Sequence, residues 1–360
     1  SNNTVSIVLN IINFLLKDSA TIEWAKTLLI TFEPANKNGF SLFGFQNYLY
    51  SFDTNTPMNP ATEVLCHDMS HPLCEYFINS SHNTYLEGDQ LAGLSSVDHY
   101  VRVLTMGCRC IELDLWDGEH VPIIKHGGTL TSSILVQDTL SAIAKYAFAT
   151  SPYPVILSLE NHLSVSQQEI FVDLVTLVLG SLLYPPFDPN VTTLPSPENL
   201  KYKILLKGDI KVSVPRLTQM IHFTSKSFDG ASRPKPDRKP WEMVSKSEIQ
   251  VDGMNEDIVK EYTASYLIRI YPAGVRFKSS NYNPINAWTL GCQMVALNFQ
   301  TAGLEMNLNI AKFTENATCG YLLKPQFLRP SLNISTAPSK LLNFTVTIFG
   351  AHQLPCRVDE

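Results

Sequence analysis

The 360-residue sequence has no clear secretory or membrane-spanning segment near its start. The run Val5–Leu16 is apolar, but Asn10 and Asn13 interrupt it and no basic segment precedes it. It is also too short to cross a bilayer. Its apolar residues recur at helical spacing, so we predict an amphipathic helix. Any membrane contact is therefore expected to be peripheral.

The sequence has few charged residues and no cysteine spacing typical of a redox or zinc motif. Charged residues make up 17% of the chain and the net charge is -6, which does not favour nucleic acid as a partner. The seven cysteines are odd in number and scattered. Cys108 and Cys110 are separated by one residue, unlike the CxxC spacing of redox and zinc sites. We therefore predict reduced, mostly buried thiols in a cytoplasmic protein.

Residues 1–61 lack the acidic ligands of a calcium-binding loop. Apolar residues at helical spacing predict helices over Trp24–Phe32 and Phe40–Tyr50, joined by the polar loop 33–39. This helix–loop–helix pattern resembles an EF-hand, but it has neither the alternating acidic ligands nor the closing glutamate. We predict a structural helix pair that binds no calcium.

From about residue 72, apolar strand-like runs alternate with amphipathic helices. Continuous apolar strands are typical of a parallel sheet buried on both faces, and strict alternation at this length predicts an α/β fold with a TIM-like (β/α) barrel. The predicted strands are Tyr76–Ser80, Cys108–Leu115, Pro122–Lys125, Pro154–Leu159 and Ile204–Leu206. The predicted helices are Val97–Thr105, Ile134–Phe148 and Ile170–Leu183, the last with a capping box from Ser166 to Glu169.

The alternation is expected to stop near residue 219. Residues 225–240 carry several prolines and predict a loop that splits the barrel. Strands resume at Tyr266–Tyr271 and Met294–Phe299, and Phe344–Phe349 predicts the first strand of an incomplete β-sandwich. The predicted division is EF-hand-like helices at 1–61, a first barrel half at 62–213, a linker and the start of the second half at 214–262, the second half at 263–330, and a linker with the β-sandwich strand at 331–360.

Polar side chains follow or end the predicted strands, where a barrel places its reactive groups. They are His82, Asn83, Glu112, Asp114, His126, Glu160 and Lys207. Each alone is commonly a solvated loop residue. Glu112 and Asp114, however, lie two apart inside the apolar string Ile111–Trp116 and share one face of the strand. Two buried carboxylates are costly without a partner, and a hard cation such as calcium would compensate them.

These segments also carry a family resemblance. The stretches SSHNTYL (80–86), GCRCIELDLWDG (107–118), PIIKHGGTLTS (122–132) and YPVILSLENH (153–162) resemble the first catalytic half of eukaryotic phosphoinositide-specific phospholipases C. The stretches LIRIYPAG (267–274), SSNYNPINAWTLGCQMVALNFQT (279–301) and GYLLKPQFLRP (320–330) resemble the second half. The resemblance implies calcium-dependent cleavage of phosphatidylinositol phosphates, expected to include the 4,5-bisphosphate, at a membrane that the protein contacts peripherally.

The resemblance also implies residue roles. His82 would stabilise the pentacovalent phosphorus and His126 would protonate the leaving oxygen. Calcium would be held by Asn83, Glu112, Asp114 and Glu160, with Glu112 also a candidate base. The inositol head group would be bound by Lys207, Ser245, Arg269 and Tyr271.

Three departures and three alternatives accompany the resemblance. Relatives carry a second lysine where this chain has Asp209, which predicts a weaker preference for the 4,5-bisphosphate unless the loop turns Asp209 outward. The matching membrane-facing positions, Leu91, Gly128, Leu130, Asp252 and Val275, form a less apolar set. The proline-rich linker is basic, whereas it is often acidic in relatives. The alternatives are a catalytically weak or inactive phosphoinositide-binding scaffold, a glycerophosphodiesterase-like barrel, and a calcium-binding module.

Overall fold

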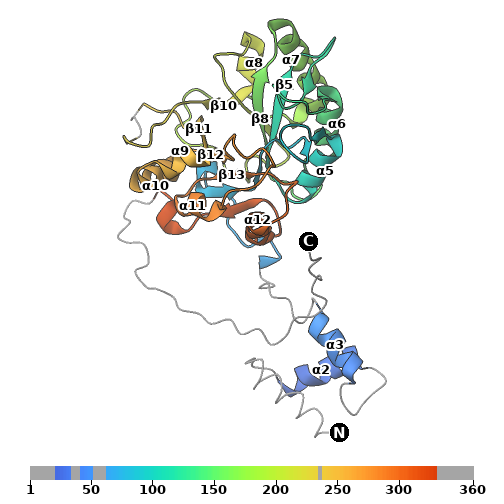
Figure 1. Cartoon of the computed structure of the whole chain (residues 1–360). Helices are drawn as coiled ribbons and strands as arrows, with labels where there is room; N and C mark the ends of the chain where they lie inside the picture. The colour runs from blue at the N-terminus through green and yellow to red at the C-terminus, as the bar shows by residue number, and fades with distance from the viewer. Residues whose placement is uncertain (1–20, 34–40, 52–61, 234–236, 331–360) are drawn as a thin grey trace.

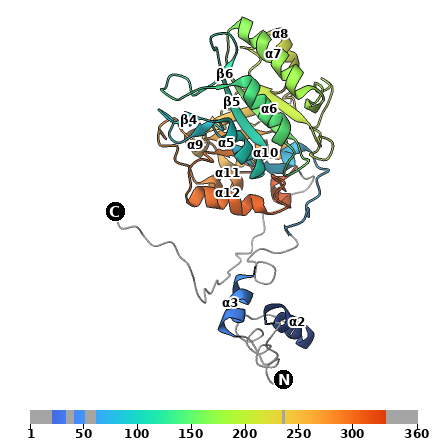
Figure 2. The same cartoon turned by 90° about the vertical axis from the view of Figure 1, so that its right-hand side faces the viewer.

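The computed structural model describes residues 21–33, 41–51, 62–233 and 237–330. Within residues 62–330, eight parallel strands close into a barrel surrounded by helices (Figures 1 and 2). Closure occurs at β2, which pairs with both β5 and β13. The barrel strands are β2 (Ser80–Ser81), β5 (Cys110–Trp116), β8 (Val155–His162), β9 (Ile204–Gly208), β10 (Ile221–Ser225), β11 (Glu242–Ser247), β12 (Ile268–Tyr271) and β13 (Met294–Leu297). The predicted TIM-like fold is confirmed.

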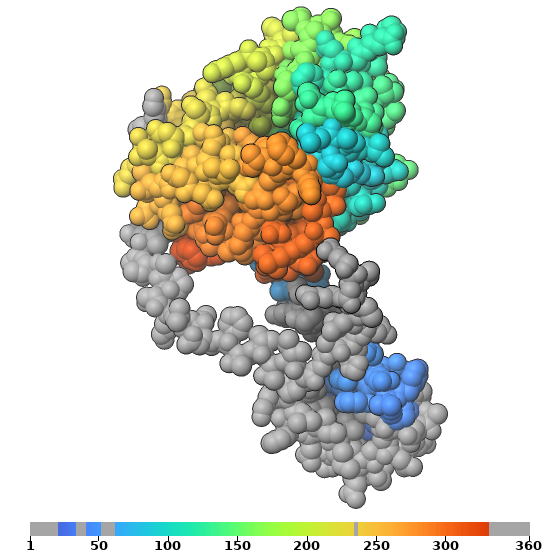
Figure 3. Space-filling model, in the orientation of Figure 1, coloured from blue at the N-terminus to red at the C-terminus, as the bar shows by residue number. Residues whose placement is uncertain are grey.

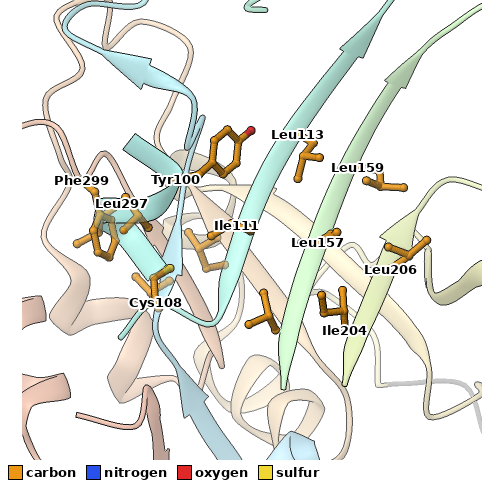
Figure 4. Packing of buried hydrophobic residues seen from close by; sticks show 14 of the residues in the cluster. Tyr100, Cys108, Ile111, Leu113, Leu157, Leu159, Ile204, Leu206, Leu297 and Phe299 are labelled. Carbon is orange, nitrogen blue, oxygen red and sulfur yellow. The ribbon is translucent and has the colours of Figure 1, made fainter. Parts of the chain in front are cut away.

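Helices form the outer layer because alternate strand residues present apolar side chains to them. Figure 4 shows Ile111 and Leu113 of β5 beside Leu157 and Leu159 of β8, in one buried cluster that includes residues from the helices. The space-filling view shows the two halves of the barrel packed directly against each other (Figure 3). The helices are α5 (Val97–Thr105), α6 (Val136–Tyr146), α7 (Val165–Leu179), α8 (Pro215–Met220), α9 (Glu248–Asp252), α10 (Glu256–Ser265), α11 (Pro284–Thr289) and α12 (Leu304–Thr314).

The inward-facing side chains change character along the barrel axis. Near the N-terminal ends of the strands they are apolar and include Cys110, Ile156, Leu205, Phe223, Met243, Leu267 and Met294. Two residues further along three neighbouring strands, Glu112, Ser158 and Lys207 face one another in register. The core therefore fills one end of the barrel and leaves a polar chamber at the other.

One predicted barrel strand is wrong. Residues 122–125 contain β6 (Ile123–Ile124), which pairs antiparallel with β5 and with β7 (Ile134–Leu135). Only a short segment joins β5 to β6, whereas a parallel neighbour needs a crossover of about a dozen residues or more. This hairpin extends the sheet at the rim, and the residues that follow it, including His126, still come to the carboxyl ends of the strands.

The prediction that alternation stops near residue 219 is also wrong. Strands β10 and β11 both lie in the interval 214–262, together with helices α8, α9 and most of α10. These strands carry polar residues such as His222, Thr224 and Lys246, so they lack the continuous apolar pattern that identified the others. Between them, the described residues of 226–241 form no helix or strand, as the prolines predicted.

The capping box predicted at Ser166 and Glu169 is not formed. Helix α7 begins at Val165 with Ser164 at the N-cap position, so Ser166 already lies in the first turn. The segment Val165–Leu182 is long and apolar enough to cross a membrane by length and composition alone. In the fold, α7 packs against α6 and α8 and buries Phe171 and Val175. An apolar helix of a soluble barrel can also have the length and composition of a membrane span.

Short elements complete the barrel. The predicted strand Tyr76–Ser80 divides into β1 (Tyr76–Ile78), which pairs antiparallel with β14 (Tyr321–Leu323), and the barrel strand β2. A small hairpin joins β3 (Leu86–Glu87) to β4 (Leu94–Ser95). The 3-10 turns whose bounds lie within the described residues of 62–330 are η3 (Leu73–Glu75), η4 (Gly180–Leu182) and η5 (Gln326–Leu328).

The predicted N-terminal helix pair is present as α2 (Ile22–Phe32) and α3 (Leu42–Tyr50). Tyr48 packs on Trp24 and Phe32 between the two helices. The Glu33 carboxylate accepts the Ser41 N–H at 2.8 Å, so it ties the end of α2 to the start of α3. Most of the connecting loop, Val5–Leu16 and Phe344–Phe349 lie outside the described residues, so the absence of calcium binding here stays a prediction.

Among the described residues, the cysteines are free thiols and all but Cys66 are buried, as predicted. Two of them, Cys74 and Cys292, lie near Lys324, which is only 1% exposed. Burial lowers the pKa of Lys324 from 10.5 to about 7. Because the pKa of Lys324 is lower in the folded state than in the unfolded state, the charged ammonium destabilises the fold. This loss of stability begins as the pH falls below about 10.5 and is complete below about pH 7.

We expect Lys324→Met to raise the free energy of unfolding near neutral pH by about 1–4 kcal/mol, the range seen when apolar residues of similar volume replace a buried ion pair as a unit. Lys324 makes no ion pair among the described residues, so its replacement leaves no buried counter-charge behind. The Thr263 carbonyl that Lys324 contacts keeps a hydrogen bond from Gln293 Nε2 at 2.6 Å. Urea unfolding should show the gain shrinking as the pH rises toward about 10. Lys145→Met, at an exposed position of α6, is the control, and a pH-independent gain at Lys324 would contradict the explanation.

Candidate active site

A cavity of about 540 Å³ opens among the C-terminal ends of the barrel strands. Its walls come from both halves of the barrel. All ten predicted site residues line it: His82, Asn83, Glu112, Asp114, His126, Glu160, Lys207, Ser245, Arg269 and Tyr271. The structure therefore brings together in one cavity the residues selected from the sequence and from its family resemblance.

Three carboxylates gather on one side of the cavity. Oxygens of Glu112, Asp114 and Glu160 lie within 4.8 Å of one another, because Asp114 and Glu160 are register partners on β5 and β8. Tyr85 donates a hydrogen bond to Asp114 Oδ2 at 2.6 Å, while the buried Oδ1 has no partner among the described residues. Burial, then Glu112 and Glu160, raise the pKa of Asp114 well above its usual range.

This acidic cluster could hold a cation. A positive charge would relieve the mutual repulsion of the carboxylates and give Asp114 Oδ1 a partner. Hard oxygen donors are the ligands that calcium and magnesium prefer. Glu160 is held in place by His162, whose Nε2 lies 2.9 Å from Glu160 Oε1 and whose ring stacks on Trp116 at 4.1 Å.

Glu112 joins the acidic cluster to a buried cation of the protein. Arg269 Nη2 donates to Glu112 Oε2 at 2.7 Å, and the same oxygen accepts the Asn83 N–H at 2.9 Å. Burial alone would raise the pKa of Glu112, but Arg269 and His82 outweigh it, so the pKa lies below its ordinary value. Glu112 is therefore held ionised, and Oε1 remains available for a ligand or a proton.

The His82 imidazole is fixed from two sides. Its Nδ1 lies 2.9 Å from Asn298 Oδ1, and Asn298 Nδ2 donates to the Ser280 carbonyl, so the amide presents its oxygen and His82 Nδ1 is the donor. The ring stacks nearly parallel on Tyr271, with centroids 6.3 Å apart. Burial lowers the pKa of His82, against the opposing effect of Glu112. An anion bound at Nε2 would favour protonation there.

His126 lines the cavity from the loop that follows β6. Its Nδ1 lies 2.6 Å from the carbonyl oxygen of Gln90, which requires the imidazole to donate Nδ1–H. His126 Nε2 can therefore accept a proton from a ligand when it is unprotonated, or donate one to a ligand when it is protonated. The His126 carbonyl accepts from Thr129, so the loop after β6 is held by its own hydrogen bonds.

Basic and hydroxyl groups form the third wall. Lys207 has no ion-pair partner among the described residues, and burial, then Arg269, lower its pKa. Ser245 faces Arg269 across the β11–β12 register, and its buried Oγ has no partner in the part of the chain that the structure describes. Arg269 Nη2 is engaged by Glu112 and the Ser81 carbonyl, while Nε is unpartnered within the same residues. This wall suits an anionic ligand.

Asp209 does not line the cavity. Its Oδ1 accepts the Lys211 N–H at 2.9 Å, which forms a tight turn just after β9. The arrangement matches the alternative in which the loop turns Asp209 outward, although Lys211 does not line the cavity either. The chain thus lacks the lysine that the family resemblance led us to expect at this position, and the Asp209 carboxylate does not face the cavity.

Sequence reasoning missed two residues that organise the site. Asn298 orients His82 and directly follows β13. A search for polar residues at the ends of strands would therefore have found Asn298 if it had included β13. Gln90 contacts both Asn83 and His126 but lies in the loop between β3 and β4, where no periodic pattern marks it.

Comparison with known proteins agrees with this geometry. Residues 69–209 match the family described as "Phosphatidylinositol-specific phospholipase C, X domain", and residues 217–327 match its "Y domain". The chain is 39% identical to 1-phosphatidylinositol 4,5-bisphosphate phosphodiesterase delta-4 of Xenopus laevis, over 97% of this chain and 54% of that protein. It is 36% identical to the zeta-1 protein of Homo sapiens, over 98% of this chain and 68% of that protein.

A solved structure shows the same likeness in three dimensions. The crystal structure of L. pealei PLC21 superposes with a TM-score of 0.78 at 33% identity and covers 91% of this chain and 48% of that chain. The chain spans about half the length of several curated relatives, including 54% of the Xenopus protein. The matches to both domain descriptions, together with 36% identity over 68% of the human zeta-1 protein, show that the chain belongs to the eukaryotic phosphoinositide-specific phospholipase C family.

Proposed function

We propose that this chain is the catalytic core of a calcium-dependent phosphoinositide phospholipase C. It would cleave phosphatidylinositol phosphates, with the 4,5-bisphosphate as the expected substrate, to diacylglycerol and inositol phosphates for intracellular lipid signalling. The observation that carries the proposal is the convergence of two histidines, three carboxylates and an anion-binding wall on one cavity. An inactive scaffold would not need to keep all of these groups.

The residues support a two-step phosphodiester cleavage. Glu112, held ionised by Arg269, takes the proton of the inositol 2-hydroxyl, whose oxygen forms a bond to phosphorus. The bond from phosphorus to the diacylglycerol oxygen breaks, and His126 gives its Nε2 proton to that leaving oxygen. Water, losing a proton to His126, then attacks phosphorus; the bond from phosphorus to the inositol 2-oxygen breaks, and Glu112 returns its proton to that oxygen. Protonated His82 donates Nε2–H to the phosphate oxygens as charge builds on them.

Asn83, Glu112, Asp114 and Glu160 would hold the calcium ion. Bound there, calcium would lower the pKa of the attacking hydroxyl and offset the negative charge on phosphate. Lys207, Ser245 and Arg269 would bind the ring phosphates, and Tyr271 would stack on the inositol ring. The unpartnered Ser245 Oγ, which lies against the cavity, supports this assignment.

We further propose that the protein works in the cytoplasm and contacts the membrane peripherally through the rim of this cavity. Leu91 and Phe277 line the cavity and are about half exposed, at 51% and 52%. Leu130 and Val275 are exposed at 89% and 71%. The loops of Leu91 and Leu130 are joined by a backbone hydrogen bond of 2.8 Å. Lipid, rather than nucleic acid, is the partner that an apolar rim around an anion-binding cavity fits.

The test is release of water-soluble inositol phosphates from vesicles that contain phosphatidylinositol 4,5-bisphosphate. We expect release that depends on calcium and stops in excess chelator. Binding to the vesicles without release at any calcium concentration would support the scaffold alternative instead. Vesicles with phosphatidylinositol 4-phosphate at equal mole fraction would show which head group is preferred.

Asp114→Asn should separate calcium binding from folding. Burial and two neighbouring carboxylates raise the folded-state pKa of Asp114, so its charge destabilises the calcium-free fold above that pKa, and the penalty is relieved as the pH falls. The calcium-free variant should therefore resist urea better than wild type near neutral pH, by an amount that shrinks toward about pH 4. Calcium should stabilise the wild type much more than the variant. A calcium-free variant less stable than wild type would contradict this.

A further inference from the structure

Gln90 connects the two sides of the site through several hydrogen bonds, and its Nε2 also lies 3.5 Å from Asn298 Oδ1, the atom that orients His82. Its Oε1 accepts from Asn83 Nδ2 at 2.8 Å, and its Nε2 donates to Ser279 Oγ at 2.8 Å. Its carbonyl oxygen accepts from His126 Nδ1 at 2.6 Å. Gln90 is 7% exposed and lies in the loop between β3 and β4, so these contacts are shielded from water.

The side-chain contact decides which atom Asn83 presents. An amide has one acceptor and one donor end, and Gln90 takes the donor end. Asn83 Oδ1 makes no hydrogen bond with the described residues, and Asn83 lines the cavity that holds the acidic cluster. A cation needs the oxygen rather than the NH₂ group. Without the acceptor at Gln90, the Asn83 amide could rotate and present its NH₂ group to the cation.

The rest of the network restricts Gln90 itself. The Ser279 hydroxyl, which accepts the hydrogen bond from Gln90 Nε2, itself donates a hydrogen bond to the Gly88 carbonyl at 2.7 Å. The Gln90 N–H donates to the Phe277 carbonyl at 2.8 Å. Asn83 has φ 42°, a conformation that most side chains disfavour, so its placement depends on contacts of this kind. The second barrel half thus fixes a residue of the first.

We propose that Gln90 is a positioning residue that turns the Asn83 oxygen toward the cation and sets the affinity of the site for calcium. The inference rests on the proposed calcium site. Substitution of the Gln90 side chain leaves the backbone contact to His126 in place, so the general acid should keep its orientation. The substitution also removes the long 3.5 Å contact from Gln90 Nε2 to Asn298 Oδ1, but Asn298 keeps its shorter hydrogen bond to His82 at 2.9 Å. The effect on calcium binding should therefore pass through Asn83.

The experiment measures calcium binding to the free protein by titration calorimetry. We expect Gln90→Met to raise the calcium Kd by about 10-fold or more, the usual scale when a supporting partner of a metal ligand is lost. Gln300→Met is the matched control. Gln300 Nε2 donates to the Gly88 carbonyl of the same loop at 3.3 Å, but it does not contact Asn83, so its Kd should stay within a factor of two or so of wild type.

A double-mutant cycle shows whether Gln90 acts through Asn83. Asn83→Ala should weaken calcium binding, and adding Gln90→Met to it should change the Kd no further. Should Gln90→Met fail to fold, Gln90→Glu keeps the acceptor oxygen and should bind calcium at least as tightly as wild type. Three outcomes would overturn the inference. The first is an unchanged calcium Kd in Gln90→Met, and the second is that Gln90→Met raises the Kd equally in wild type and in Asn83→Ala. The third is a raised Kd in Gln90→Glu. No calcium binding by wild type, or none lost in Asn83→Ala, would instead overturn the proposed calcium site, and the inference with it.

Discussion

Replacing His126 with alanine is expected to slow cleavage of phosphatidylinositol 4,5-bisphosphate by about 10²–10⁴, the usual contribution of a positioned general acid. The diacylglycerol alkoxide is a poor leaving group, so its oxygen needs a proton as the bond to phosphorus breaks. His126 donates Nδ1–H to the Gln90 carbonyl, so its Nε2 is the nitrogen that can deliver this proton. The rate should be measured as inositol phosphate release from vesicles at saturating calcium.

Two comparisons make this result specific. His120→Ala is the control, because His120 lies outside the cavity with a side chain that is 84% exposed, and it should leave the rate unchanged. A soluble inositol phosphodiester with a nitrophenolate leaving group needs no protonation, so His126→Ala should lose far less activity on it. An equal loss on both substrates would show that His126 has another role.

The first barrel half could be predicted well because its strands are continuous apolar runs. Glu112 and Asp114 stand out against such a run, and strand-end polarity led directly to His82, Glu160 and Lys207. The barrel strand predicted wrongly, at Pro122–Lys125, is a two-residue strand in a hairpin, and its direction is set by the short connection rather than by its composition. His126 reached the site in either topology.

The second half was harder because β10 and β11 mix polar and apolar residues. Ser245 lies on β11 and entered the prediction only through the family resemblance. Gln90 and Asp209 lie in loops, where the direction of a side chain is decided by long-range or turn contacts such as those with Ser279 and with the Lys211 N–H. No local pattern encodes the Gln90–Ser279 contact, which joins residues 189 apart in the sequence. The Asp209–Lys211 contact is a local turn of a kind that aspartate favours, but the turn alone does not say whether the side chain faces the cavity.

Glu112→Gln is expected to have the largest effect, on activity and on stability together. Glutamine keeps the shape of Glu112, but it can neither take the hydroxyl proton nor bring charge to the calcium site, so kcat/KM should fall by about 10³ or more. It also leaves Arg269, which is 2% exposed, without its counter-charge. Breaking a buried ion pair from one side costs about 3–5 kcal/mol, which urea unfolding would measure.

A second substitution separates these two effects. In Glu112→Gln/Arg269→Met both partners of the buried pair are neutral, and replacing such a pair as a unit is often neutral for stability. The double variant should therefore regain most of the lost unfolding free energy. Its activity should not recover, because the proton acceptor, a calcium ligand and the proposed Arg269 contact to the ring phosphates are all missing. If activity returned together with stability, Glu112 would be needed only to compensate Arg269, and the base in the reaction would have to be another group of the cavity.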